Sequence, residues 1–195
     1  MPGQDCERRL SEDVQSILEG MYLEASCEKL LAFLLDERPQ IRIQAALRLK
    51  KCGAVLAART LAVRIQMEPH PEVKRVYLYA IAFMDKRTAT RWLSSIVATT
   101  DDETVLYYGL HTLHLHGLKA AWAALPLLTE SRPAVLFAAV QYLQSFEPQP
   151  TNLPGAIARL RNIIDSCEVD WKSELRGDYF KGKKYVLNLL DDWTS

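Results

Sequence analysis

One segment of the chain recurs four times at a nearly constant interval, and this recurrence limits the possible fold more than any other feature. The copies begin at Pro39, Pro71, Glu103 and Pro133, so successive starts lie 32, 32 and 30 residues apart. Apolar or small residues occupy equivalent positions in steps of four, which places them on one side of a helix. These positions are Ile41, Val73, Val105 and Val135, then Ala45, Tyr77, Gly109 and Ala139, then Leu49, Ile81, Leu113 and Leu143.

Each copy opens at a turn-forming stretch and is followed by a second amphipathic stretch. Proline is tolerated in the first turn of a helix, and Asp or Ser caps the free amides there. Sustained alternation of apolar and polar residues and tight hairpin turns, the usual signs of strands, are absent. The second stretches are Ala57 to Met67, Arg87 to Ala98, Lys119 to Thr129 and Pro154 to Ser166. The pattern predicts an all-α protein built from pairs of helices.

Helix pairs with this period that open with Pro-x-Val/Ile-Arg/Lys resemble HEAT repeats, and most closely the short bacterial type often called HEAT-like. Arg42 and Lys74 match the basic residue of that motif, whereas Leu106 and Leu136 depart from it. The resemblance covers roughly Cys27 to Ser166. It implies a right-handed α-solenoid of about four to five stacked helix pairs, because one pair cannot bury its apolar face alone.

The ends of such a stack need capping helices. We expect one domain over 1–195, with an N-terminal cap at 1–26, repeats at 27–166 and a C-terminal cap at 167–195. The N-terminal helix is predicted at Leu10 to Glu24 with Ser11 as its N-cap, and the C-terminal helix at about Asp178 to Trp193. Its apolar residues Tyr179, Val186, Leu187, Leu190 and Trp193 are predicted to close the last pair.

The compartment is predicted from what the sequence lacks. Met1 to Leu10 contains no hydrophobic core of a signal peptide, and no apolar run approaches the roughly 18 residues of a membrane span. The four cysteines, Cys6, Cys27, Cys52 and Cys167, do not have the spacing of metal ligands. These observations predict a cytoplasmic protein with free thiols.

The formal net charge of zero conceals an uneven distribution. Residues 1–37 carry a net charge of −6, and residues 38–94 carry +9. The pooled balance offers no general electrostatic attraction for nucleic acid or membranes. The basic block nevertheless coincides with the two repeats that match the motif best.

The candidate partner-binding residues come from this block and its continuation. In HEAT folds the second helices line the concave face, so the resemblance implies that basic residues on them form a groove for an acidic protein. These residues are Arg59, Arg64, Arg87, Arg91 and Lys119, which Arg159 and Arg161 could extend. Arg87 and Arg91 are predicted to face away from the stripe of Trp92 and Ile96. The alternative is that the bases are scattered, solvated charges or partners of the acidic N-terminal region.

Candidate chemistry elsewhere is sparse, and we predict no catalytic residue, metal site or cofactor. Gly177 to Lys184 approximates a phosphate-binding loop, but Lys184 stands where a Ser or Thr should be and no strand precedes it. His111, His114 and His116 form a cluster without a clear third metal ligand. Trp92 and Trp122 lie at helical core spacing, so we expect both in the core, Trp122 together with Leu125 and Leu128.

The leading interpretation is a non-enzymatic protein-binding module, such as a bacterial adaptor or a toxin-immunity protein. The resemblance leaves two alternatives open. One is a nucleic-acid-binding protein similar to HEAT-like DNA glycosylases. The other is a chromophore-handling protein similar to HEAT-like bilin lyases, in which Tyr77, Tyr79, Tyr107 and Tyr108 would line the site.

Overall fold

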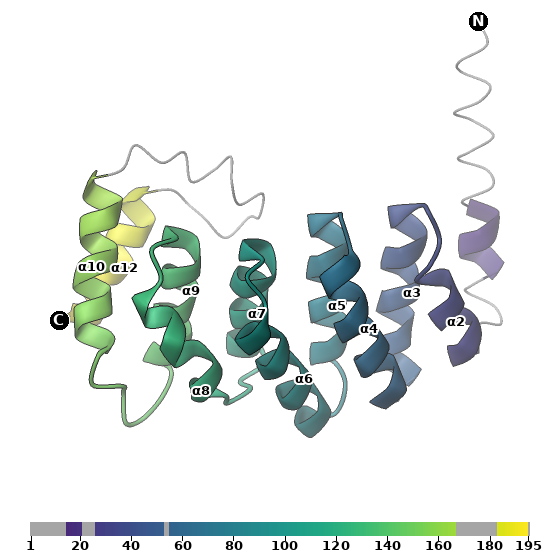
Figure 1. Cartoon of the computed structure of the whole chain (residues 1–195), viewed down its shortest axis with the longest axis horizontal. Coiled ribbons are helices and arrows are strands. Elements are labelled where there is room, and N and C mark those ends of the chain that lie inside the picture. Colours follow the sequence, from purple (N-terminus) through teal and green to yellow (C-terminus); the bar gives the residue numbers. More distant parts are fainter. Residues whose placement is uncertain (1–14, 21–25, 53–54, 167–182, 195) are drawn as a thin grey trace, which may run out of the picture. The chain divides into compact units, whose positions relative to one another are not determined.

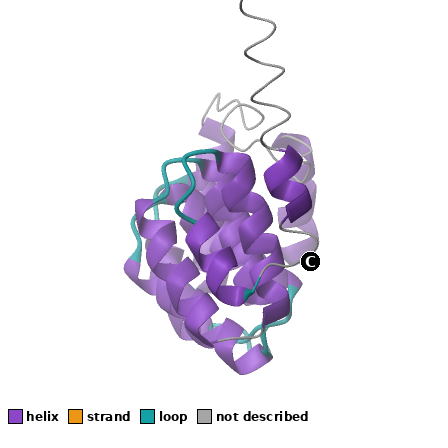
Figure 2. Cartoon of the chain, turned by 90° about the vertical axis from the view of Figure 1, so that its right-hand side faces the viewer, coloured by secondary structure: helices purple, strands orange, loops and turns teal. Residues whose placement is uncertain are grey.

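The computed structural model describes residues 15–20, 26–52, 55–166 and 183–194. These residues form helices and connecting loops without any strand, which confirms the predicted all-α class (Figures 1 and 2). They group into two compact units, one ending at Leu118 and the other starting at Lys119. Within the described residues, no helix is both long and apolar enough to cross a membrane.

The described part of the first unit includes six helices that follow the predicted repeats closely. They are α2 (Cys27–Phe33), α3 (Pro39–Cys52), α4 (Val55–Met67), α5 (Pro71–Ala82), α6 (Lys86–Thr99) and α7 (Glu103–Leu115). Residues 15–20, inside the predicted N-terminal helix, are also helical, whereas its proposed N-cap Ser11 lies outside the described residues.

The helices begin where the sequence supplies caps. The Asp85 carboxylate accepts a hydrogen bond from the Thr88 amide, and the Asp102 carboxylate accepts one from the Val105 amide, both at 3.0 Å. Pro39 and Pro71 each stand at the first position of a helix. A proline there loses no hydrogen bond, because the first amides of a helix have no partner within it.

The first unit has two layers. Helix α5 packs between α3 and α7, while α4 and α6 pack against each other and against α5 (Figure 1). The predicted apolar stripe lies in the core between them, since its members in this unit are all buried: Ile41, Ala45, Leu49, Val73, Tyr77, Ile81, Val105, Gly109 and Leu113.

The basic residues of the repeat motif form ion pairs within the first unit. Arg42 at the start of α3 binds Glu68, which follows α4. One repeat later, Lys74 at the start of α5 binds Asp102, which precedes α7. The motif's basic residue therefore ties one first helix to the turn before the next.

The second unit is built from α8 (Ala121–Ala124), the 3-10 helix η1 (Leu125–Thr129), α9 (Pro133–Gln144), α10 (Leu153–Ser166) and α12 (Lys183–Thr194). The single helix predicted over Lys119 to Thr129 is wrong, because the segment divides at Leu125. Pro126 lacks the amide that would continue an α-helix there. Val186 and Leu190 of α12 are buried as predicted, and Trp193 stacks on Phe137 with ring centroids 6.0 Å apart.

Two expectations about individual residues are corrected. Trp122 is 59% exposed and Leu125 is exposed as well, so only Leu128 of that predicted core stripe is buried. The short α8 and the 3-10 helix after it change which side chains face the core.

Cys27 is disulfide-bonded, so the prediction of a free thiol is wrong for this residue. The phosphate-loop-like residues 177–182 and Tyr179 lie outside the described residues.

Candidate functional site

Helices α4 and α6 form one outer surface of the first unit. The three-residue loop 68–70 connects α4 to α5, and the three-residue loop 83–85 connects α5 to α6. Both helices therefore run antiparallel to α5 and parallel to each other. Their inner sides are buried through Leu61 and Ile65 of α4 and Leu93 and Val97 of α6, which leaves the opposite sides toward solvent.

An open groove of about 390 Å³ lies between the C-terminal halves of these two helices. Its lining residues are Ala62, Val63, Gln66 and Met67 from α4 and Trp92, Ser95, Ile96 and Thr99 from α6. Met67 is 72% exposed and Val63 is 56% exposed, both high values for large apolar side chains. Exposed apolar side chains that gather in one place commonly mark interaction sites.

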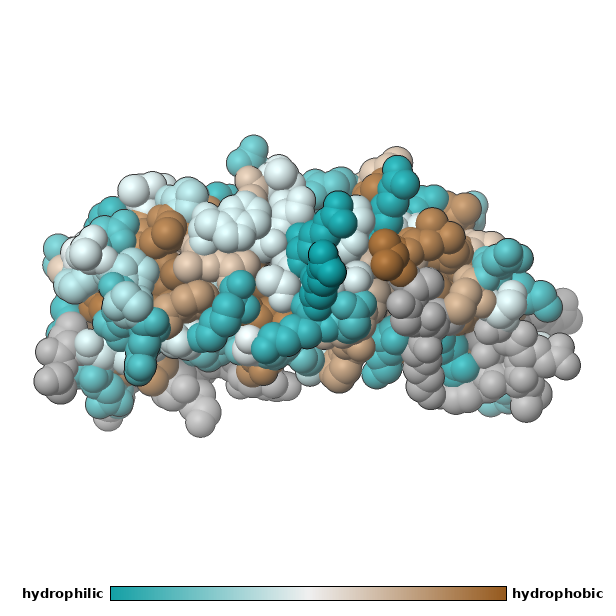
Figure 3. Space-filling model, turned by 90° about the horizontal axis from the view of Figure 1, so that it is seen from below, coloured by the Kyte–Doolittle hydropathy of each residue, from teal (hydrophilic) through white to brown (hydrophobic). Residues whose placement is uncertain are grey.

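Basic residues precede the groove on both helices. Arg59 lies one turn before Val63, while Arg87 and Arg91 lie one turn apart on the exposed side of α6, which continues to Ser95. In the first unit, hydrophilic and apolar side chains reach the surface beside one another (Figure 3). We call Arg59, Arg87, Arg91 and the groove-lining residues together the α4/α6 surface.

The α4/α6 surface carries uncompensated positive charge. Helices α4 and α6 contain Arg59, Arg64, Lys86, Arg87 and Arg91 but neither Asp nor Glu. None of these five side chains forms an ion pair with another described residue, whereas Arg38, Arg42, Lys74, Arg75, Arg132 and Arg161 all do. The local field therefore favours an acidic ligand.

Arg91 connects the basic part of the surface to the groove. Its guanidinium carbon lies 5.8 Å from the centroid of the Trp92 ring, within the range of a cation–π contact. Trp92 is half-buried and forms part of the groove wall. Arg87 and Arg91 are exposed whereas Leu93, Ile96 and Val97 are buried, so both arginines point away from the buried part of the stripe as predicted, and Arg91 lies over the half-buried Trp92 at its edge.

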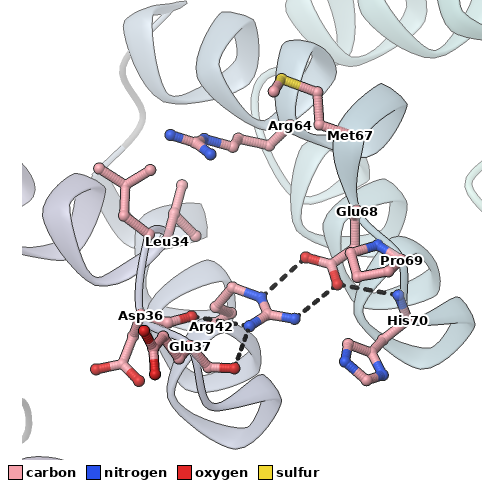
Figure 4. A pocket seen from close by; sticks show the side chains of 10 residues that line it. Leu34, Asp36, Glu37, Arg42, Arg64, Met67, Glu68, Pro69 and His70 are labelled. Carbon is pink, nitrogen blue, oxygen red and sulfur yellow. Dashed lines mark hydrogen bonds and ion pairs between the residues drawn. The ribbon is translucent and has the colours of Figure 1, made fainter.

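Arg64 lies beside a second pocket of about 260 Å³, between the end of α2, the start of α3 and the end of α4. Figure 4 shows Arg64 and Met67 on one side of this pocket and the Arg42–Glu68 pair on the other. Each nitrogen of the Arg42 guanidinium donates a hydrogen bond, since Nε and Nη2 bind Glu68 and Nη1 donates to the carbonyls of Asp36 and Glu37. Met67 lines both pockets, so Arg64 borders the α4/α6 surface without lining its groove.

The other predicted bases belong to the second unit and have partners there. The Lys119 ammonium donates to the Ser145 carbonyl at 2.6 Å and lies 4.3 Å from the Phe146 ring centroid. Arg159 donates to the Leu128 carbonyl, and Arg161 pairs with Asp191. The structure thus places Arg59, Arg87 and Arg91 on the exposed sides of the neighbouring helices α4 and α6, and it gives Lys119 an intramolecular role at the end of α9.

The histidine cluster gains no further potential metal ligands among the described residues. No group of three or more potential metal-ligating side chains occurs there. His111 stacks on Tyr107 with centroids 6.2 Å apart, and burial lowers its pKa. Tyr77 and Tyr107 are buried, so the expectation that they line a chromophore site is wrong. Burial also raises the pKa of Tyr77 to about 12.

Two features were missed by sequence reasoning. The first is the groove of the α4/α6 surface. The sequence pattern that could have indicated it is the spacing of Arg59, Val63 and Met67 by four residues, which places them on one side of α4. The second is a partly exposed aromatic cluster of Tyr79, Phe83 and His116, with centroids 4.9 to 5.4 Å apart. It forms because the C-terminal ends of α5 and α7 lie side by side.

No protein-family model matches the chain, and no curated protein or solved structure shows significant similarity to it.

Proposed function

We propose that the protein is a non-enzymatic binding module whose first unit binds an acidic segment of a partner protein over the α4/α6 surface. One observation carries the proposal. The helices α4 and α6 contain five bases and no acid, of which Arg59, Arg87 and Arg91 belong to this surface, and none of the five is paired with another described residue. An acidic partner would supply the missing counter-charges and speed association.

The apolar groove favours a protein ligand over a nucleic acid. Nucleic acids are bound mainly through many phosphate contacts, whereas Val63 and Met67 offer apolar area to a peptide side chain. Protein-binding surfaces commonly combine an apolar centre with a polar rim. The α4/α6 surface has this composition, with Trp92 and arginines, residue types that often dominate binding energy.

We further propose that the helix pairs belong to a HEAT-like α-solenoid, since helices α3 to α7 repeat the same pairing and the motif's bases tie successive turns together. Such scaffolds present rigid surfaces without inherent chemistry. An adaptor or an immunity protein that blocks a toxin would use the surface in this way.

Fluorescence anisotropy with defined probes tests the proposed function. The probes are a labelled peptide rich in Glu and Leu, the same peptide with Lys in place of Glu, and a labelled DNA duplex. We expect the protein to bind the acidic peptide and to leave the basic peptide free. Charge reversal in Arg87→Glu/Arg91→Glu should weaken binding at least about tenfold, since it replaces attraction by repulsion.

A matched control separates the surface from net charge. Arg75→Glu/Arg161→Glu changes the net charge equally, but both arginines are paired within the chain and lie off the α4/α6 surface. This variant should bind the acidic peptide within about twofold of the parent. Equal loss in both variants would contradict the proposed surface, and preferential binding of the duplex would favour the nucleic-acid alternative.

A further inference from the structure

We infer that the ligand of the α4/α6 surface is bipartite, with acidic residues grouped directly beside one or two large apolar anchors. The inference rests on the proposed function. It follows from the order of side chains along the two helices. Arg59, Arg87 and Arg91 lie in the N-terminal halves of α4 and α6, whereas the groove occupies their C-terminal halves.

Because the two helices are parallel, the basic residues precede the groove-lining residues in the same direction on both of them. A helix rises about 1.5 Å per residue, so the groove residues Val63 and Met67 lie about 6 and 12 Å beyond Arg59 along α4. On α6, Ser95 and Thr99 have the same offsets from Arg91. The surface is therefore a basic half followed by an uncharged half, the groove, in which the apolar Val63, Met67, Trp92 and Ile96 lie among the polar Gln66, Ser95 and Thr99.

The ligand must reproduce this separation. An extended segment covers about 6 to 12 Å in roughly two to four residues, and a helix covers it in one to two turns. An acid placed within the groove would lose water without meeting a base among the groove-lining residues, which is unfavourable. A ligand whose acidic and apolar residues alternate is therefore discriminated against.

Trp92 is a positioning residue in this arrangement. It separates the two halves, because its ring lines the groove while the Arg91 guanidinium lies over it. An arginine held against an aromatic face loses fewer conformations when it binds a carboxylate. The acid next to the anchor is therefore recognised by an Arg91 that Trp92 has already oriented.

Two peptides of identical composition test the bipartite ligand by fluorescence anisotropy on the full chain. In the block probe, four Glu precede Leu-Phe-Leu directly; in the alternating probe, the same residues alternate. We expect the block probe to bind at least about tenfold more tightly. If both probes bind the parent protein equally well and neither binds Arg87→Glu/Arg91→Glu, the inference of a bipartite ligand is wrong. The proposed function would be unaffected by that result. Failure of both probes to bind would overturn the proposed function itself.

The role of Trp92 is tested through salt dependence. Trp92→Leu keeps an apolar groove wall but removes the face that holds Arg91. At about 50 mM salt we expect roughly threefold to tenfold weaker binding of the block probe, and little difference at about 500 mM, where exposed charges are screened. Trp92→Phe should recover part of the loss, because it restores an aromatic face.

Trp122→Leu is the matched control, since Trp122 is exposed in the second unit and should leave binding unchanged. Thermal unfolding of each variant shows whether the fold is retained. If Trp92→Leu weakens binding of the block probe equally at low and high salt, Trp92 only lines the groove and does not position Arg91.

Discussion

Arg42 and Glu68 form a doubly hydrogen-bonded ion pair in the interior of the first unit. The Arg42 Nε donates to one Glu68 carboxylate oxygen at 2.9 Å and Nη2 donates to the other at 2.7 Å. Their side chains are only 9% and 5% exposed. The hydrogen bond to Glu68 raises the pKa of Arg42 although burial opposes it. The pair joins the start of α3 to the end of α4.

Removing one charge of this pair should be costly. Glu68→Gln leaves a buried guanidinium without a counter-charge, so we expect the free energy of unfolding to fall by about 3 kcal/mol in urea titration. Glu72→Gln, which breaks the exposed pair with Arg75, should change it by less than about 0.5 kcal/mol. Similar effects of both substitutions would contradict a buried, structurally important pair.

Gly109 marks a close approach of α7 to α6. A Cβ at this position would lie 2.7 Å from the Val97 Cγ2 atom, inside van der Waals contact. Gly109→Ala should therefore lower the free energy of unfolding by about 1 kcal/mol, despite its better helix propensity. In a Val97→Ala background the same change should be neutral or stabilising, because the clash is gone.

Gly155 in α10 is the control for this pair, since a Cβ there would meet no atom within 4 Å. Gly155→Ala should raise the free energy of unfolding by up to about 1 kcal/mol. Additive effects of Gly109→Ala and Val97→Ala would show that the two positions do not clash.

Two buried tyrosines differ in their hydrogen bonds. The Tyr142 hydroxyl accepts a 2.7 Å hydrogen bond from the Ala120 amide, whereas the Tyr77 hydroxyl is buried and has no hydrogen-bond partner among the described residues. Tyr142→Phe should lower the free energy of unfolding by about 1 to 3 kcal/mol, since it leaves the buried Ala120 amide without its acceptor. Tyr77→Phe should cost less than about 0.5 kcal/mol or stabilise, because it removes an unsatisfied group. The opposite ranking in urea titrations would contradict these environments.

Stability should decline as the pH falls through the range of histidine. Burial lowers the pKa of His111, with His114 adding to the effect, and burial also lowers the pKa of His116. Each of the two is then neutral in the fold at a pH where the unfolded chain, with a histidine pKa of about 6.5, takes up a proton. Their contribution is intact above about pH 6.5 and is lost progressively below it.

Thermal unfolding between about pH 8 and pH 5.5 measures this dependence, and the midpoint should fall toward the acid end. The double variant His111→Asn/His116→Asn should show a flatter profile even if it is less stable throughout. A midpoint that rises on acidification would contradict the assigned directions.

The helices of the repeats could be predicted from the sequence because their signals are local and strong. Pro71 and Asp102 mark helix starts, and stripes such as Val73, Tyr77 and Ile81 recur at a period that only a helix buries. The prediction failed over Lys119 to Thr129, where one proline, Pro126, divides the segment although its apolar spacing continues. Periodicity alone does not register the missing amide.

The candidate site could be predicted only in part. Charge counting located Arg59, Arg87 and Arg91, because net charge over a block of sequence needs no structure. The HEAT-like layout added Lys119 as a continuation of this row, but its partners Ser145 and Phe146 are far along the chain and could not be inferred. The groove was missed, since the exposure of Met67 depends on how α4 packs against α6.

Chemical-shift mapping of the isotope-labelled full chain with the acidic block probe tests the central claim most directly. We expect shift changes concentrated on the α4/α6 surface, including the Trp92 indole N–H, the Arg91 backbone amide and the Met67 methyl. These changes should disappear in Arg87→Glu/Arg91→Glu. Changes concentrated instead at the aromatic cluster of Tyr79, Phe83 and His116, or around Trp122, would contradict the account.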